Sequence, residues 1–214
     1  MKKYSLLLFI FLLAYGLSAQ QSDDFSAMKE IEILKEKINK VSENTRTIQS
    51  DFIQEKHLTM LEEVIISKGR FLFRKENDVR WEYSSPINYV IVIYEGKFRI
   101  KNDEKISEFD IGSNALFQQI NKMIVTAIRG DFVDNPEFEA SFFESAKQYR
   151  VKLKALNKQV AEMLAGIEIF FSKETLAVER VMFIEPGEDY TNIIFNNRKV
   201  NFEITDNQFE LNDE

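Results

Sequence analysis

The chain has 214 residues, no cysteine and a formal net charge of −7. The lack of cysteine predicts a protein without disulfide bonds or a lipid-bearing cysteine, and it excludes thiolate catalysis and thiolate metal sites. The acidic balance argues against a nucleic-acid partner, because phosphates require a basic surface. The 19 phenylalanines and 7 tyrosines, in a chain whose mean hydropathy is only −0.28, supply a large aromatic area that must be buried or enclosed.

The first nineteen residues have the pattern of a secretory signal peptide. Lys2 and Lys3 precede an apolar run from Leu6 to Ala14, and small residues follow up to Ala19. This run is too short to span a membrane, and the small residues are typical of a cleavage site. We therefore expect cleavage after Ala19, export as a soluble protein, and a single domain over residues 20–214.

Residues 28–43 are predicted to form an amphipathic helix, because Ile31, Leu34, Ile38 and Val41 recur at helical spacing. About eleven strands follow, most of them alternating between apolar and polar residues. Their expected ranges are 45–56, 64–74, 79–83, 88–95, 97–101, 105–111, 138–144, 148–155, 166–172, 177–185 and 189–197.

Two further helices are expected within the run of strands. One begins at Ser113 or Asn114 and ends near Gly130, and a short one covers residues 157–164. Sequential antiparallel strands of this kind favour a mainly β (α+β) fold, namely an incomplete, strongly curved barrel. A barrel of about eleven strands is wide enough for an apolar cavity, and the mid-chain helix can lie over its mouth as a lid.

The segment from Gly69 to Pro86 predicts a hairpin with one strongly apolar face. Phe71 and Phe73 alternate with arginines on the first strand, and Trp81 is central to the same pattern on the second. Periodicity alone leaves two interpretations open: these side chains fill a core, or they line a cavity.

The sequence offers little for catalysis. His57 is the single histidine, so the usual Ser-His-Asp, Cys-His and zinc-ligand sets are nearly excluded. Carboxylates such as those of Glu62 and Glu63 are numerous, but a solvated charged surface explains them better than a glycosidase pair. We expect no enzymatic activity, no metal and no cofactor.

The ordered set of motifs resembles the LolA-type family of periplasmic outer-membrane lipoprotein carriers. The resemblance covers essentially the whole chain after the signal peptide. The matching residues are Phe52, Gln54, Lys56, Gly69, Phe71, Phe73, Arg80, Trp81, Pro86, the strand and turn from Val90 to Gly96, and Asn201, Ile204 and Phe209.

This resemblance implies a periplasmic carrier that shields lipoprotein acyl chains in an apolar cavity and moves them from the inner to the outer membrane. Its implied partners are an inner-membrane lipoprotein-releasing transporter and an outer-membrane acceptor, and the carrier itself would be a monomer. The expected cavity residues are Phe52, Phe71, Phe73, Trp81, Tyr83, Ile91, Ile93, Phe98, Phe117, Ile120, Met123, Ile124, Ile169 and Met182.

Arg74 and Lys75 lie where family members have a basic-Arg-Pro step whose arginine tethers the lid. Lys75 replaces that arginine, and lysine cannot form the same forked hydrogen bonds. Two alternatives therefore remain: a carrier of a free phospholipid, glycolipid or other acylated metabolite, and a non-enzymatic sensor or protein-binding module.

Overall fold

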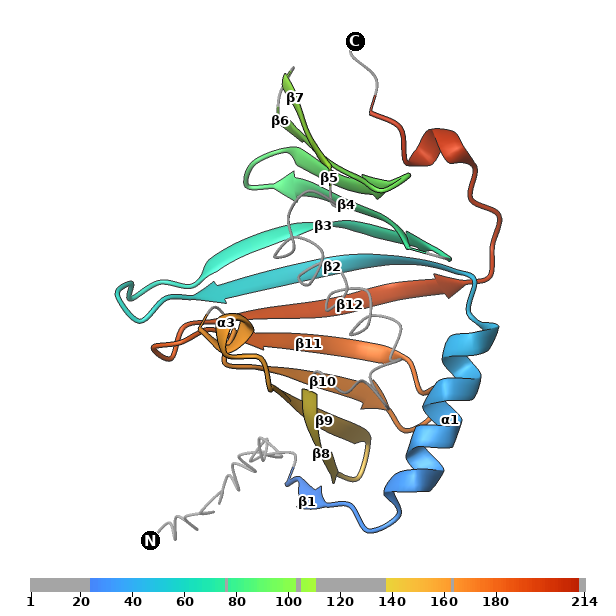
Figure 1. The fold of residues 1–214 in the computed structure, drawn as a ribbon, viewed down its shortest axis with the longest axis vertical. Helices are drawn as coiled ribbons and strands as arrows, with labels where there is room; N and C mark the ends of the chain where they lie inside the picture. Colours follow the sequence, from blue (N-terminus) through green and yellow to red (C-terminus); the bar gives the residue numbers. More distant parts are fainter. Residues whose placement is uncertain (1–23, 76, 103–104, 111–137, 163, 212–214) are drawn as a thin grey trace, which may run out of the picture.

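The computed structural model describes residues 24–75, 77–102, 105–110, 138–162 and 164–211 (Figure 1). Within these ranges the chain forms one antiparallel sheet, a long helix and two short helical turns. The helices are α1 (Ile31–Asn44), α3 (Lys158–Ala161) and the 3₁₀ turn η2 (Asp206–Gln208). The strands are β1 (Ser26–Ala27), β2 (Thr47–His57), β3 (Ile65–Arg74), β4 (Asp78–Ser85), β5 (Tyr89–Tyr94), β6 (Lys97–Asn102), β7 (Lys105–Asp110), β8 (Phe138–Glu144), β9 (Gln148–Ala155), β10 (Gly166–Ser172), β11 (Val178–Ile184) and β12 (Tyr190–Val200).

The sheet has twelve strands and does not close into a barrel. Its strand order is β1-β8-β9-β10-β11-β12-β2-β3-β4-β5-β6-β7, so β1 and β7 form its two edges. The chain therefore builds two runs of hairpins, and β12 joins them by pairing with β2 (Figure 1). The predicted incomplete antiparallel barrel is confirmed. The additional strand is β1, which has only two residues and pairs with β8.

Helix α1 packs against the half of the sheet that contains β8 to β11. Its buried side chains Leu34 and Ile38 lie four residues apart on one helical face, and both join a cluster with Val151 and Val181. Figure 1 shows the helix running along the ends of β10 and β11. The prediction of this helix is confirmed, although it begins at Ile31, three residues later than expected. Short helix α3 also lies in its predicted range.

The strand register divides the apolar side chains between the two faces of the sheet. Directly paired residues share a face, so the pairings of Phe52 with Phe195 and of Ile193 with Val181 connect the two halves of one face. We call this surface the aromatic face. In β2 to β6 and β12 its apolar residues are Ile48, Phe52, Phe71, Phe73, Val79, Trp81, Tyr83, Tyr89, Ile91, Ile93, Phe98, Ile193 and Phe195.

The opposite face of β3 to β5 is covered by the C-terminal segment, residues 201–211. Phe209 is fully buried and packs with Ile204 against Leu72 and Val92. The ring of Tyr94 stacks on Phe209 with 5.9 Å between centroids. The C-terminal segment therefore closes one side of this half of the sheet with its own small core.

The predicted signal peptide and the predicted helix from 113 or 114 to about 129 both lie outside the described residues.

Candidate functional site

The aromatic face is held together by rings in edge and tilted contact. The Phe52 ring lies 4.8 Å from Trp81 and 5.0 Å from Tyr83, both in T-shaped geometry. Phe71 lies 4.7 Å from Trp81 and 5.9 Å from Phe195. Such pairs add to the hydrophobic stabilisation, because the positive edge of one ring meets the negative face of another.

Gly69 provides the space in which the Phe52 ring lies. The two residues are directly paired between β2 and β3. A Cβ atom added at Gly69 would overlap the carbonyl oxygen of Glu82 and would lie 2.8 Å from Cζ of Phe52. This glycine is therefore required by close approach of the neighbouring strand and ring, and its backbone φ is unremarkable.

The structure brings most of the predicted cavity residues onto the aromatic face. One group lies in its main cluster: Phe52, Phe71, Phe73, Trp81, Tyr83, Ile91, Ile93 and Phe98. Ile169 is fully buried in the adjoining cluster, which shares Phe183 and Phe195 with the first. Another group lies outside the described residues: Phe117, Ile120, Met123 and Ile124.

The placement of Met182 among these residues was wrong. Met182 pairs with Glu168 and Asn192, whereas its neighbours Val181 and Phe183 belong to the apolar clusters of the aromatic face. Alternation along β11 consequently directs Met182 to the opposite face. The error arose because Val181, Met182 and Phe183 are all apolar, and three apolar residues in a row do not identify the inward side.

Several residues of the aromatic face were missing from the expected set, although the sequence contained signals for them. Val79 alternates with Trp81, and Ile193 and Phe195 alternate within β12. Ile48 precedes Phe52 by four residues in β2, a spacing that keeps both on one face. Nothing in the alternation indicated Arg198, which lies beside these residues and is described below.

Arg74 forms ion pairs with Asp78 on β4 and with Asp206 in the C-terminal segment. Its guanidinium donates to Asp78 at 2.9 Å and to Asp206 at 2.7 Å, and it lies over the Phe209 ring at 4.8 Å. These partners lie on β4 and on the C-terminal segment, on the opposite side of the sheet from the aromatic face. Alternation from Phe73 turns Arg74 away from the aromatic face, and Arg74 ties down the C-terminal segment. Whether Arg74 also contacts the mid-chain helix is untested, since that helix lies outside the described residues.

Lys75 is exposed and lies at the end of α1. Its Nζ atom donates to the main-chain oxygen of Glu43 at 3.4 Å, and its own backbone N–H donates to Arg46. A cation at the carboxyl end of a helix interacts favourably with the unpaired carbonyls there. Lys75 thus contacts α1, and whether it also contacts the mid-chain helix is untested.

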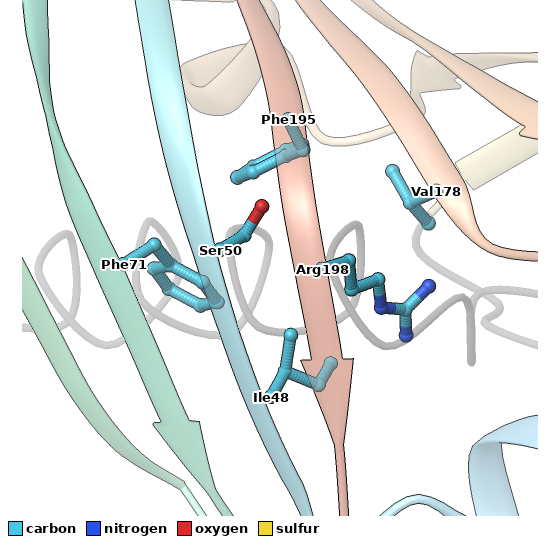
Figure 2. A pocket seen from close by; sticks show the side chains of 6 residues that line it. All are labelled: Ile48, Ser50, Phe71, Val178, Phe195 and Arg198. Atoms are coloured by element: carbon cyan, nitrogen blue, oxygen red, sulfur yellow. The ribbon is translucent and has the colours of Figure 1, made fainter.

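A small pocket opens on the aromatic face where its two clusters meet (Figure 2). Its volume is about 10 Å³, which is room for about one water molecule. The lining side chains come from β2, β3, β11 and β12: Ile48, Ser50, Phe71, Val178, Phe195 and Arg198. An acyl chain needs far more space than this pocket offers, so these side chains must move apart before one can enter.

Tyr83 supplies a polar group at the border of the aromatic face. Its hydroxyl donates to Oε1 of Gln54 at 2.9 Å, and its ring stacks on Tyr89 with 4.1 Å between centroids. Burial, followed by the neighbouring Tyr89, raises the pKa of Tyr83 well above its ordinary value. The neutral phenol is therefore the form that the folded protein favours.

This environment predicts a loss of stability in alkali. The pKa of Tyr83 is raised on folding, so its contribution is fully present below the unfolded pKa of about 10 and declines as the pH rises above that value. In urea titrations between pH 8 and pH 11 we expect the Tyr83→Phe variant to lose stability less steeply than the wild type. Identical slopes for the two proteins would contradict this account of Tyr83.

The described residues show no arrangement that suggests catalysis. His57 stacks on the Tyr190 ring with 4.2 Å between centroids, without a carboxylate partner among these residues. Nor do histidine and acidic side chains gather in groups of three or more that could hold a metal ion in the part of the chain described. No helix there is long and apolar enough to cross a membrane.

Comparisons with solved structures show distant likenesses. An uncharacterised conserved protein from Thermus thermophilus is 11% identical, with a TM-score of 0.51, and the match covers 84% of this chain and 90% of that one. A LolA superfamily protein from Nitrosomonas europaea is 6% identical, with a TM-score of 0.45 and coverage of 86% and 99%. The lipoprotein LppX from Mycobacterium tuberculosis is 8% identical, with a TM-score of 0.46 and coverage of 83% and 99%.

No curated protein matches the sequence. The family described as "Outer membrane lipoprotein carrier protein LolA" matches residues 43–212, which include β2 to β12 and nearly all of the C-terminal segment. The open antiparallel sheet with its apolar inner surface agrees with the fold that the sequence motifs implied. This chain belongs to the LolA family of outer-membrane lipoprotein carrier proteins.

Proposed function

We propose that the protein binds the acyl chains of lipoproteins on its aromatic face and carries them through the periplasm from the inner to the outer membrane. The observation that carries this proposal is the pair of adjoining apolar clusters on the aromatic face, one on β2 to β6 and β12 and the other on β8 to β11. Membership of a carrier family adds to it. In this account the predicted signal peptide exports the chain, which then acts as a monomer.

The energetics of lipid transfer require such a surface. Each methylene removed from water contributes about 0.8 kcal/mol of favourable free energy, so exposing one palmitoyl chain to water costs roughly 10 kcal/mol. A protein that replaces this water with aromatic and aliphatic side chains lowers the barrier to crossing an aqueous compartment. No bond needs to be made or broken, which is consistent with a face that holds rings and few polar groups.

Entry of an acyl chain into the small pocket beside Arg198 would require a change of conformation, because that pocket has room for about one water molecule. The rings that now contact one another must part, and the acyl chain must replace the contacts that they lose. A cargo stabilises the opened state only by its greater affinity for that state. Release to an acceptor likewise depends on the difference between two affinities, which permits transfer without chemistry.

The proposal is tested by identifying the bound cargo and by measuring which lipids compete for the binding site. Protein purified from the periplasm should yield acylated molecules on organic extraction and mass spectrometry. A triacylated lipopeptide should displace a bound fluorescent lipid at lower concentration than a free lysophospholipid does. If the free lipid competes better, the cargo is a free lipid; if nothing is extracted and neither compound binds, the carrier function is wrong.

A matched pair of variants locates the binding surface. Ile91 belongs to the aromatic face, and Ile91→Trp should fill space that the acyl chain needs, weakening lipid binding about tenfold or more through overpacking. Ile87 lies between β4 and β5 and is 62% exposed, so Ile87→Trp should leave binding unchanged. Equal binding by both variants would place the lipid elsewhere. A protein partner whose binding survives Ile91→Trp would instead favour a sensor or protein-binding module.

A further inference from the structure

Arg198 is a cationic side chain within an otherwise mostly apolar pocket. It extends from β12 between the two clusters of the aromatic face, near Val178 of one cluster and Ile48 of the other (Figure 2). Phe195, which contacts both clusters, precedes it by three residues. An acyl chain that crosses from one half of the aromatic face to the other would therefore pass close to this guanidinium.

A β-bulge places Arg198 on this face. Asn196 pairs with Asp51, but the next paired residue on β12 is Lys199, opposite Gln49. Asn197 and Arg198 thus both lie opposite the single residue Ser50. Bulges of this kind redirect side chains, and they occur frequently beside functional sites.

Side-chain hydrogen bonds stabilise the bulge. Asn197 has a φ of 54°, in the left-handed region that asparagine tolerates better than most residues. Its Nδ2 atom donates to the Asp51 carboxylate at 2.8 Å, and the Ser50 hydroxyl donates to the main-chain oxygen of Asn196 at 2.6 Å. Without the extra residue, simple alternation from Phe195 would direct Asn197 to the aromatic face in place of Arg198.

The Arg198 guanidinium has no partner among the residues that the structure describes. Its Nε atom is buried without a hydrogen bond, and no carboxylate there lies within ion-pair distance. Burial lowers the pKa of Arg198, and no acid within the described ranges offsets that effect. Arginine nevertheless remains charged in proteins, so the folded protein bears the cost of an incompletely solvated cation.

Arginines on the other side of the sheet differ from Arg198 in this respect. Arg74 forms ion pairs with Asp78 and Asp206, and Arg80 pairs with Glu82. Arg150 lies 3.8 Å from Glu168. The chain thus supplies carboxylates to these cations and supplies none, within the described ranges, to Arg198.

We propose that Arg198 binds the anionic group of the cargo, a carboxylate or phosphate oxygen attached to an acyl chain. This inference rests on the proposed lipid-carrier function and concerns a free acidic lipid as cargo, since the acyl chains of a lipoprotein are attached through uncharged ester and amide bonds. A guanidinium presents its donors in a planar fork that matches either oxyanion, and charge-assisted hydrogen bonds are about twice as strong as neutral ones. The aromatic face would supply affinity for the chain, while Arg198 would select acidic lipids over neutral ones.

The test compares lipids that share a hydrocarbon chain and differ in the charge of the head group. Oleate and oleyl alcohol share a hydrocarbon chain, and lysophosphatidic acid offers a phosphate on the same chain. Calorimetric titration of the wild type should give at least about tenfold tighter binding of oleate than of oleyl alcohol, as expected for a charge-assisted bond. Arg198→Met should reduce this ratio to near one while leaving oleyl alcohol binding intact, and Arg198→Lys should retain part of it.

Lys199→Met is the matched control, because it removes the same charge one residue away on the exposed opposite side of β12. The Lys199→Met variant should keep the wild-type preference for oleate over oleyl alcohol. A wild-type preference that survives in Arg198→Met would overturn the assignment, as would displacement of oleate by inorganic phosphate alone at comparable concentration. If the wild type binds neither oleate nor oleyl alcohol, the carrier function itself fails, and that outcome is distinct from loss of selectivity.

Discussion

Replacing Gly69 with alanine should destabilise the protein by about 3 kcal/mol, at the upper end of the range for overpacked sites. The added methyl group would overlap the Glu82 carbonyl oxygen on β4 and would crowd the Phe52 ring. The carbonyl belongs to a paired strand and cannot move without disturbing the ladder, so the strain must spread through β3 and β4. Urea unfolding followed by Trp81 fluorescence measures the loss.

Gly96 provides the control for this prediction. Its φ is +71°, but a Cβ atom there would meet no heavy atom within 4 Å. Gly96→Ala should therefore cost only the conformational penalty of about 1 kcal/mol. If Gly69→Ala proves no more destabilising than Gly96→Ala, then the close packing of Phe52 over Gly69 is not a feature of the folded protein.

Replacing Phe71 with alanine should cost about 3–5 kcal/mol of folding stability, as is typical for a fully buried phenylalanine. Phe71 has no exposed surface and contacts the rings of both Trp81 and Phe195. Its removal leaves a cavity on the aromatic face that the neighbouring rings fill only in part. Calorimetric or urea unfolding of the purified variant gives the difference.

Two further variants make this prediction specific. Phe71→Leu retains most of the buried volume and should lose markedly less stability than Phe71→Ala. Phe109 on the edge strand β7 is 46% exposed, and Phe109→Ala should cost about 1 kcal/mol or less, since half of its surface already faces water. Equal losses at Phe71 and Phe109 would show that Phe71 is not buried within the aromatic face.

Much of the fold was predictable from the sequence because most strands have one face packed and the other polar. Alternation of Phe71 and Phe73 with Arg70 and Arg74 identified both the strand and its inner side. The helix at residues 31–44 was equally well predicted by the spacing of its apolar residues. In each of these cases a single local pattern agreed with the tertiary environment.

The sequence-based predictions failed where the local pattern of residues does not determine the position of a side chain in the fold. Met182 has apolar neighbours on both sides, so its face depends on the register with Asn192 rather than on composition. The bond from Arg74 to Asp206 joins residues 132 positions apart, and no local pattern indicates such a contact. Arg198 reaches the aromatic face only because of a bulge, and strict alternation cannot anticipate an inserted residue. Strand β1 has two residues, too few to show any period.

The most direct test of the central claim uses the single tryptophan as a reporter. Trp81 lies within the aromatic face, and a lysophosphatidylcholine with a brominated stearoyl chain quenches only indoles that it approaches closely. We predict saturable quenching of Trp81 by this lipid. The control is the double variant Trp81→Phe, Ile66→Trp, which moves the single tryptophan to a residue that is 51% exposed on the opposite face of β3. In this control we predict no more than background quenching. Bound lipid that leaves Trp81 unquenched, or that quenches both proteins equally, would contradict a carrier that holds acyl chains on this face.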